Sequence, residues 1–101
     1  MTMVERIDFI LKEGIGKKFK HFEGGNYVVV GFSKHTTNGD VLVNYINANS
    51  SDHMMFSEPL ETFADVVDRN KYPTAKQYYR LEHTGVCSMK LVLKRLYGVW
   101  L

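Results

Sequence analysis

The stretch GKKFKHFEGGNYVVVGFSKHTTNGDVLVNYI, residues 16–46, decides the fold. β-Branched and aromatic residues fill its segments 27–32 and 41–46, as is typical of strands buried on at least one face. The tetrapeptide EGGN at 23–26 favours a turn with positive φ. The dipeptide NG at 38–39 predicts a hairpin with a type I′ turn, which needs positive φ at both central residues. The stretch therefore predicts antiparallel strands joined by tight turns.

Shorter elements flank these strands. Segments 19–22, 53–57 and 76–82 each favour a further short strand. Pro59 can open a turn of helix at its first position, continuing through Leu60, Phe63 and Val66. Several short strands joined by tight turns predict a mainly β (α+β) fold, either a small, strongly bent antiparallel sheet or a barrel.

A helix is expected at the N-terminus, over residues 2–13. Thr2 and Glu5 have the spacing of a capping box. The apolar face of this helix must dock on the body or on a second subunit, and Gly14 is expected to end the helix in a left-handed conformation. The predicted apolar face consists of Val4, Ile7, Ile10 and Leu11.

The segment 88–101 fits a helix and a strand. An apolar stripe at helical spacing favours the helix, and we expect it either to cover the sheet or to serve oligomerisation. The stripe consists of Met89, Leu93, Leu96 and Trp100. We expect a single domain over 1–101, with a helix in 1–14, a β core in 16–82 and an apolar extension in 86–101.

Composition places the chain among ordinary globular proteins, with 45% hydrophobic and 24% charged residues. Thirteen Lys and Arg against eleven Asp and Glu give a net charge of +2, too small to indicate nucleic acid without local clustering. The one cysteine, Cys87, suits a reducing compartment. With no apolar run of membrane length and no signal-peptide pattern, we expect a cytoplasmic protein that does not bind membranes.

The order of these motifs resembles a family of short bacterial and phage proteins, domain of unknown function 1653. The family pattern is a basic-aromatic start, a Tyr-x-Val strand, a histidine before a turn, a V-x-Y strand and a W-V-R-P-L-x-x-F segment. The matching positions, within about residues 16–81, are Phe19, His21, Phe22, Gly24 or Gly25, Tyr27, Val29, His35, Gly39, Val43, Tyr45, Pro59, Leu60 and Phe63.

That resemblance implies a strongly bent sheet of the Src-homology-3-like barrel type. It implies no reaction, because no activity is established for the family. The family's Trp and Arg before the proline correspond here to Phe56 and Glu58. A role that needs a positive charge at that arginine is therefore not carried over to this chain.

Basic residues cluster in the first predicted strand. Lys18 and Lys20 share one face of that strand, while Phe19 and His21 share the other. Lys34 and His35 lie across the first turn and are expected to add to the same patch. The patch is either a solvated edge that discourages edge-to-edge pairing or a contact surface for an anion.

The tyrosines of the predicted strands also allow two interpretations. Tyr27 and Tyr45 lie on predicted strands and either build the core or form a stacking platform for bases. Histidine spacing does not indicate a metal site, and no cofactor motif or nucleophilic constellation is present, so we expect no enzyme.

The sequence therefore favours a non-catalytic binding module for an anionic, nucleotide-like ligand. That ligand is a small signalling nucleotide or single-stranded nucleic acid, with sequestration by a phage protein as one role. The predicted contact residues are Lys18, Lys20, His21, Lys34, His35, Tyr27 and Tyr45. The alternative is a protein–protein interaction or assembly domain that uses the sheet edge and the apolar extension, and in either case a homo-oligomer is expected.

Overall fold

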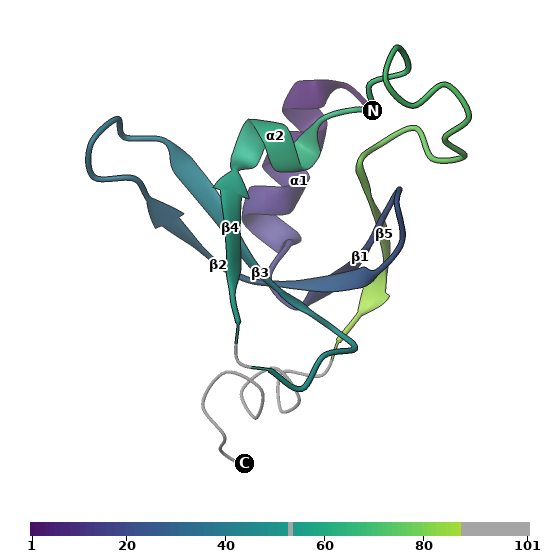
Figure 1. Cartoon of the computed structure of the whole chain (residues 1–101). Coiled ribbons are helices and arrows are strands. Elements are labelled where there is room, and N and C mark those ends of the chain that lie inside the picture. Colours follow the sequence, from purple (N-terminus) through teal and green to yellow (C-terminus); the bar gives the residue numbers. More distant parts are fainter. Residues whose placement is uncertain (53, 88–101) are drawn as a thin grey trace.

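The computed structural model describes residues 1–52 and 54–87 of the chain (Figure 1). Five strands and two helices follow one another in these residues. They are α1 (Met3–Glu13), β1 (Lys17–His21), β2 (Asn26–Lys34), β3 (Val41–Asn47), β4 (Phe56–Pro59), α2 (Leu60–Ala64) and β5 (Leu81–Val86).

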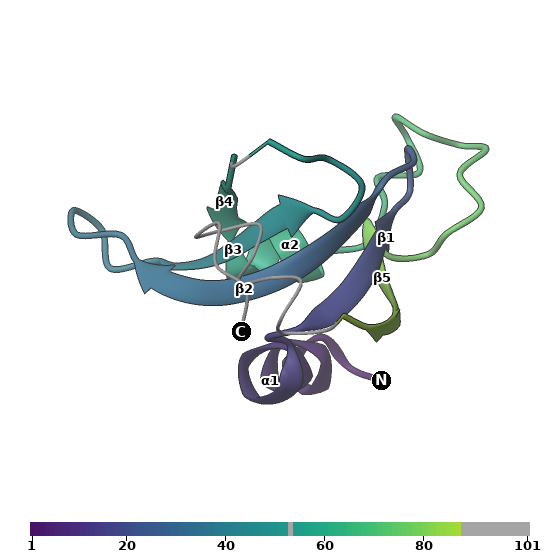
Figure 2. The ribbon, with the colours of Figure 1, turned by 90° about the horizontal axis from the view of Figure 1, so that it is seen from below.

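The strands form one antiparallel sheet in the order β4-β3-β2-β1-β5. Among the described strands β4 and β5 each have a single neighbour, so the sheet is not closed. It is strongly bent, and its register shifts at Lys18/Phe19 and at Val29/Gly31 are the kind of irregularity that bends a strand (Figures 1 and 2). The mainly β fold and the bent antiparallel sheet are thus confirmed, while a closed barrel is not formed.

One face of the sheet packs against both helices. Alternation along β2 sends Val29 to this face and Val28 to the opposite one, and both are buried. Ile10 of α1 and Phe63 of α2 meet in the same core, where the Phe63 ring packs edge-on against Phe19 at 5.1 Å. The core consists of Ile10, Phe19, Val29, Val43, Leu60, Phe63, Ala64 and Leu81.

Helix α1 is attached to this core by a buried arginine. The Arg6 side chain is only 4% exposed. Its Nε donates to the Ala64 carbonyl at 2.7 Å, and its Nη2 donates to the Leu81 carbonyl. The guanidinium also lies 3.9 Å from the centre of the Tyr79 ring. One side chain therefore joins α1 to the end of α2 and the start of β5.

The N-terminal helix confirms some expectations and corrects others. The capping box of Thr2 and Glu5 is present. The predicted apolar face is partly wrong, since Val4 and Leu11 are exposed and the buried positions are Arg6 and Ile10. The left-handed exit is also misplaced. Gly14 stays right-handed at φ −70°, because its amide continues the helical hydrogen bond to the Ile10 carbonyl.

The chain turns left-handed two residues later, at Gly16, where φ is +84°.

The β2–β3 hairpin lies where it was predicted, but its turn type was wrong. Gly39 has a positive φ of 77°, whereas no described non-glycine residue does, so Asn38 cannot belong to a type I′ turn. The loop is longer and is closed by the His35 amide on the Asp40 carbonyl at 2.8 Å. Asn38 instead accepts the Asp40 amide on its side-chain oxygen.

Several element ends were also displaced. The first strand is Lys17–His21 instead of 19–22, and the last is Leu81–Val86 instead of 76–82. Pro59 precedes α2 instead of starting it, and Val66 lies beyond the helix, bridged to Tyr79.

The stripe of Met89, Leu93, Leu96 and Trp100 lies outside the described residues, as does His53, the first residue of the predicted segment 53–57. The strand predicted there is observed as Phe56–Pro59.

Candidate functional site

Strand β1 divides the predicted contact residues between its two faces. Phe19 is fully buried in the core, and Lys20, its neighbour on the opposite face, is exposed. His21 ends the strand on the Phe19 side and stacks on the Phe22 ring at 4.7 Å. Of the predicted basic residues, Lys20 and His21 thus reach the end of the sheet where β1 turns into β2.

Lys34 and His35 do not reach that end. Lys18 pairs with Val28, whereas Lys34 lies six positions farther along β2, where it pairs with Val41. At about 3.3 Å per residue the separation is about 20 Å. That exceeds twice the Debye length of about 8 Å at physiological salt. The single basic patch expected from the sequence is therefore not formed.

Tyr27 and Tyr45 belong to a packed aromatic cluster. Their rings meet edge-on at 5.3 Å, and Tyr45 also contacts Phe56 at 5.7 Å and Phe63 at 5.5 Å. Burial, aided by the Glu58 carboxylate, raises the pKa of the Tyr45 hydroxyl to about 12. Tyr45 therefore packs against three neighbouring rings, and its hydroxyl is neutral at pH 7.

A long loop, residues 68–77, faces the β1–β2 turn. Its ends are held together by the Val66–Tyr79 bridge and by the Val67 amide, which donates to the Tyr78 carbonyl at 2.9 Å. From within, the Arg69 guanidinium donates to the Ala75 carbonyl and, at 2.8 Å, to the Gln77 carbonyl. Such closed surface loops, held by their own side chains, are frequently functional.

Loop 68–77 and the end of β1 enclose the first of two hollows. We call it the lysine hollow, because Lys20, Lys71 and Lys76 line it against a single carboxylate, Glu23. Its volume is about 510 Å³. Gln77 fixes one wall by donating from Nε2 to the Lys20 carbonyl at 3.0 Å. The remaining lining residues are Phe22, Tyr72, Pro73, Thr74, Ala75 and Gln77.

The second hollow, of about 300 Å³, adjoins the first, and we call it the arginine hollow. The two share four lining residues, Phe22, Glu23, Lys71 and Tyr72. The Phe22 and Tyr72 rings meet edge-on at 4.8 Å and form a common aromatic wall. The other residues that line the arginine hollow are His21, Asp65, Val66, Asp68 and Arg80.

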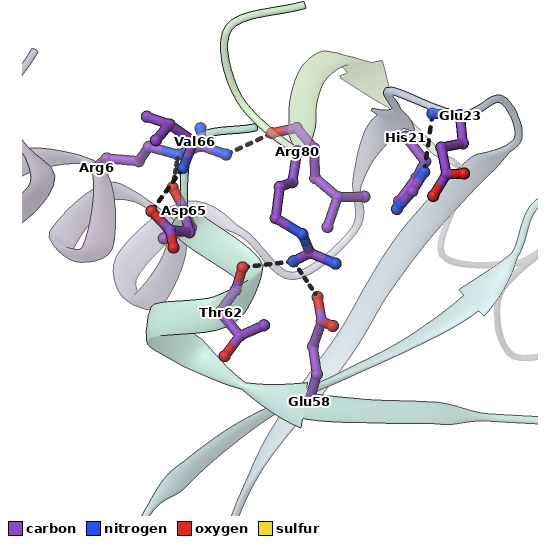
Figure 3. Close-up of polar contacts among 10 residues, drawn as sticks. Arg6, His21, Glu23, Glu58, Thr62, Asp65, Val66 and Arg80 are labelled. Atoms are coloured by element: carbon purple, nitrogen blue, oxygen red, sulfur yellow. Dashed lines mark hydrogen bonds and ion pairs between the residues drawn. The ribbon is translucent and has the colours of Figure 1, made fainter. Parts of the chain in front are cut away.

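Arg80 is positioned by residues on two elements. Its Nη1 donates to Glu58 of β4 at 3.3 Å and to the Thr62 carbonyl of α2. Figure 3 shows these contacts on one side of the guanidinium, with the His21 ring on its other side. Glu58, which precedes Pro59 at the end of β4, therefore forms an ion pair with Arg80.

His21 is held as a neutral donor. Its Nδ1 accepts the Glu23 amide at 3.0 Å, so the neutral ring carries its proton on Nε2. Burial lowers the pKa of His21, and the positive charge of Arg80 lowers it further, against the opposing effect of Glu23 and Glu58. The ring is thus held uncharged beside the arginine.

Most of this site was not recognised in the sequence. Lys76 begins the predicted strand 76–82, whereas Lys71, Tyr72, Asp65 and Asp68 carried no predicted role in binding. The whole connection from α2 to β5, residues 65–80, is longer than most loops of compact domains, and loops of that length are often functional.

Two further results concern the described residues as a whole. None of the helices in 1–52 and 54–87 has the length and apolarity needed to span a membrane. In the same residues no three His, Cys, Asp or Glu side chains gather where they could hold a metal ion.

Comparison with known proteins gives one match. The model of a family described as Protein of unknown function (DUF1653) matches residues 17–83. No curated protein and no solved structure matches the chain. The matched residues include the whole sheet except the end of β5, together with α2 and both hollows, and leave α1 outside. Because the match spans more than half of the 101 residues, the chain belongs to this family of unknown function, DUF1653.

Proposed function

We propose that the protein is a non-catalytic binding module for an anionic, nucleotide-like ligand, held in the lysine hollow. The observation that carries this proposal is the composition of that hollow, in which Lys20, Lys71 and Lys76 face a space walled by Phe22 and Tyr72. Lysines bind phosphate as point charges, and aromatic rings stack on bases.

Size and charge support the same ligand class. A volume of about 510 Å³ lies within the range of small-molecule sites. Three lysines against one glutamate give the lining a charge of +2, equal to the net charge of the entire chain. By contrast, a hollow of about 290 Å³ between α1 and the β2–β3 loop is lined by Asp40 and Glu61 and by no basic residue.

The loop that lines the lysine hollow is also largely ordered before a ligand binds. Loop 68–77 is already tied by Arg69 and Gln77, so less entropy is lost when a ligand immobilises it. A small signalling nucleotide and single-stranded nucleic acid both remain within the proposal, as does sequestration of such a ligand in the cytoplasm by a phage protein. Salt distinguishes them, because polymer binding weakens steeply through counterion release.

Calorimetric titration with nucleoside monophosphates and with an oligonucleotide tests the proposal. Replacing Lys71 and Lys76 together by Ala should weaken binding at least about tenfold, or about 1.4 kcal/mol. The matched control, Lys12→Ala with Lys34→Ala, removes equal charge far from the hollow and should change affinity less than about twofold. Binding by neither ligand, or equal weakening by both double variants, would refute the proposal.

A second candidate is an assembly domain, favoured by the exposed edge at β4. Met54, Met55 and Phe56 are 62%, 45% and 45% exposed and follow one another at this edge. Edge strands and contiguous apolar patches are common sites of association. Native mass spectrometry tests this candidate. A homo-oligomer that Met55→Ser with Phe56→Ser dissociates would support it, and a monomer at micromolar concentration would exclude self-assembly there.

A further inference from the structure

The arginine hollow offers hydrogen-bond donors and acceptors together, with two aspartates among its lining residues where the lysine hollow has none. His21 directs its Nε2–H away from the Glu23 amide, which occupies Nδ1. Arg80 uses Nη1 for Glu58 and for the Thr62 carbonyl, and the rest of its guanidinium lies on the side of His21 (Figure 3). Both residues line the hollow. Two N–H donors, one at the end of β1 and one just before β5, therefore line one space.

Acceptors come from the segment that leads out of α2. Asp65 and Asp68 line the hollow, and each uses its Oδ1 for a backbone amide, that of Val66 at 2.7 Å and that of Asn70 at 3.0 Å. These bonds fix both carboxylates and leave each a second oxygen, since a carboxylate has about four acceptor positions. The lining thus contains fixed acceptors as well as donors, with Asp65 lying on the Arg6 side of Arg80 and His21 on the other (Figure 3).

The net charge of this lining argues against a second anion. Lys71 and Arg80 are outnumbered by Glu23, Asp65 and Asp68, and Arg80 is already paired with Glu58. A phosphate would meet a surplus of carboxylates here. A neutral ring that carries both donors and acceptors on its edge meets no such penalty.

Aromatic side chains form the walls that such a ring needs. His21 is stacked on Phe22 at 4.7 Å, and Phe22 meets Tyr72 at 4.8 Å. Phe22 and Tyr72 also line the lysine hollow, so the two hollows adjoin at these rings. One nucleotide would therefore place its base in the arginine hollow and its phosphate in the lysine hollow.

We propose that the arginine hollow is a guanine-specific base site, so that the ligand of the two joined hollows is a guanine nucleotide. This inference rests on the proposed function. Guanine presents two acceptors, O6 and N7, which an arginine recognises best among the bases. Its N1–H and 2-amino group are donors that carboxylates accept. Adenine would place an amino donor where guanine has O6, opposite the donors of Arg80 and His21.

Calorimetric titration of the unmodified chain with GMP, IMP and AMP provides the test. IMP differs from GMP only in lacking the 2-amino group, so it should bind about tenfold or more weakly, as expected when a hydrogen bond to a charged acceptor is lost. AMP should bind more weakly than IMP. 7-Deaza-GMP, which lacks the N7 acceptor, should also bind more weakly than GMP.

Asp65→Asn combined with Asp68→Asn tests the acceptors, because asparagine retains an oxygen for the Val66 and Asn70 amides while losing the charge. The preference for GMP over IMP should fall below about threefold. The control is Asp52→Asn, since Asp52 caps the Met54 amide in the same manner at 3.2 Å and lies outside both hollows. Melting temperatures of the variants report whether they remain folded.

The outcomes separate the two proposals. If none of the nucleotides binds the unmodified chain, the proposed function itself fails. If GMP, IMP and AMP bind with equal affinity, the nucleotide site stands and guanine specificity is overturned. A preference for GMP that survives in the folded double variant also overturns it, because the acceptors would then lie elsewhere.

Discussion

Replacing Arg6 by methionine should strongly destabilise the protein, although Arg6 lies outside the matched family residues. Methionine retains a long unbranched stem and a good helix propensity, so α1 itself should persist. What is lost is the guanidinium, which serves two main-chain carbonyls and one ring. The variant therefore isolates the polar end of the side chain.

The size of the effect follows from those contacts. Leaving the Ala64 and Leu81 carbonyls without a donor costs about 1–3 kcal/mol each when they are buried. Loss of the cation–π contact with Tyr79 adds about 1 kcal/mol. Part of this is offset, because burial lowers the pKa of the Arg6 guanidinium and so disfavours its charge in the fold. We expect a net loss of about 3 kcal/mol, out of the 5–15 kcal/mol typical of whole domains.

Urea unfolding at pH 7 measures this loss as a lower transition midpoint at an unchanged slope. The control is Lys12→Met on the same helix, whose ion pair with Asp8 is largely exposed, so that it should cost less than about 0.5 kcal/mol. Arg6→Lys should fall between the two, because one ammonium cannot reproduce the forked contact with both carbonyls. A loss below about 1 kcal/mol for Arg6→Met would refute the reasoning that this arginine fastens α1 to the body.

Two further predictions concern the β1–β2 turn and the histidine beside it. Gly25→Ala should cost about 1–2 kcal/mol of unfolding free energy, because φ is +91° there and the new Cβ would lie 3.3 Å from the Tyr27 ring. Gly31→Ala is the control, because a Cβ added at Gly31 would meet no atom within 4 Å. Equal melting temperatures of the two variants would contradict the prediction. The pKa of His21 is lowered in the fold, so as pH falls below about 6.5 the unfolded chain takes up a proton at this residue before the folded chain does. The contribution of the neutral His21 to folding stability should therefore be complete above that pH and decline below it. Urea unfolding at pH 7.5 and 5.0 should show a smaller decline for His21→Asn, and an identical decline would count against a lowered pKa.

The central strands could be predicted because burial and β propensity agree there. β2 and β3 contain runs of valine, tyrosine and isoleucine, and their pairing places Val29 opposite Tyr45 and Val28 opposite Ile46. An error in register by one residue would move Val29 out of the core, so the alternation leaves little freedom. These two strands build the middle of the sheet, and the bent architecture follows from them.

Helix α1 shows where such patterns fail. Counting apolar residues placed Val4 and Leu11 on the buried face and left Arg6 out of it. The observed face is rotated because the Arg6 side chain donates to two carbonyls, one at the end of α2 and one at the start of β5. These partners lie 58 and 75 residues away in the sequence. No local pattern reports a hydrogen bond of that kind, so composition favoured the wrong face.

The candidate site could not be predicted from the sequence for the same reason, because its residues come together from distant parts of the chain. Arg80 and Glu58 are separated by 22 residues, and Gln77 reaches Lys20 across 57. Neither pair has a spacing that marks a motif, and each forms only because the Val66–Tyr79 bridge folds loop 68–77 back onto β1. The lysines of β1 were expected to share a patch with Lys34 and His35 along the next strand, whereas loop 68–77 is what lies beside Lys20. A sheet separates the two ends of a hairpin by the full strand length, whereas a closed loop brings its residues to one end. In this sheet the residues that gather beside the end of β1 therefore come from the loop after α2, and not from the far end of β2.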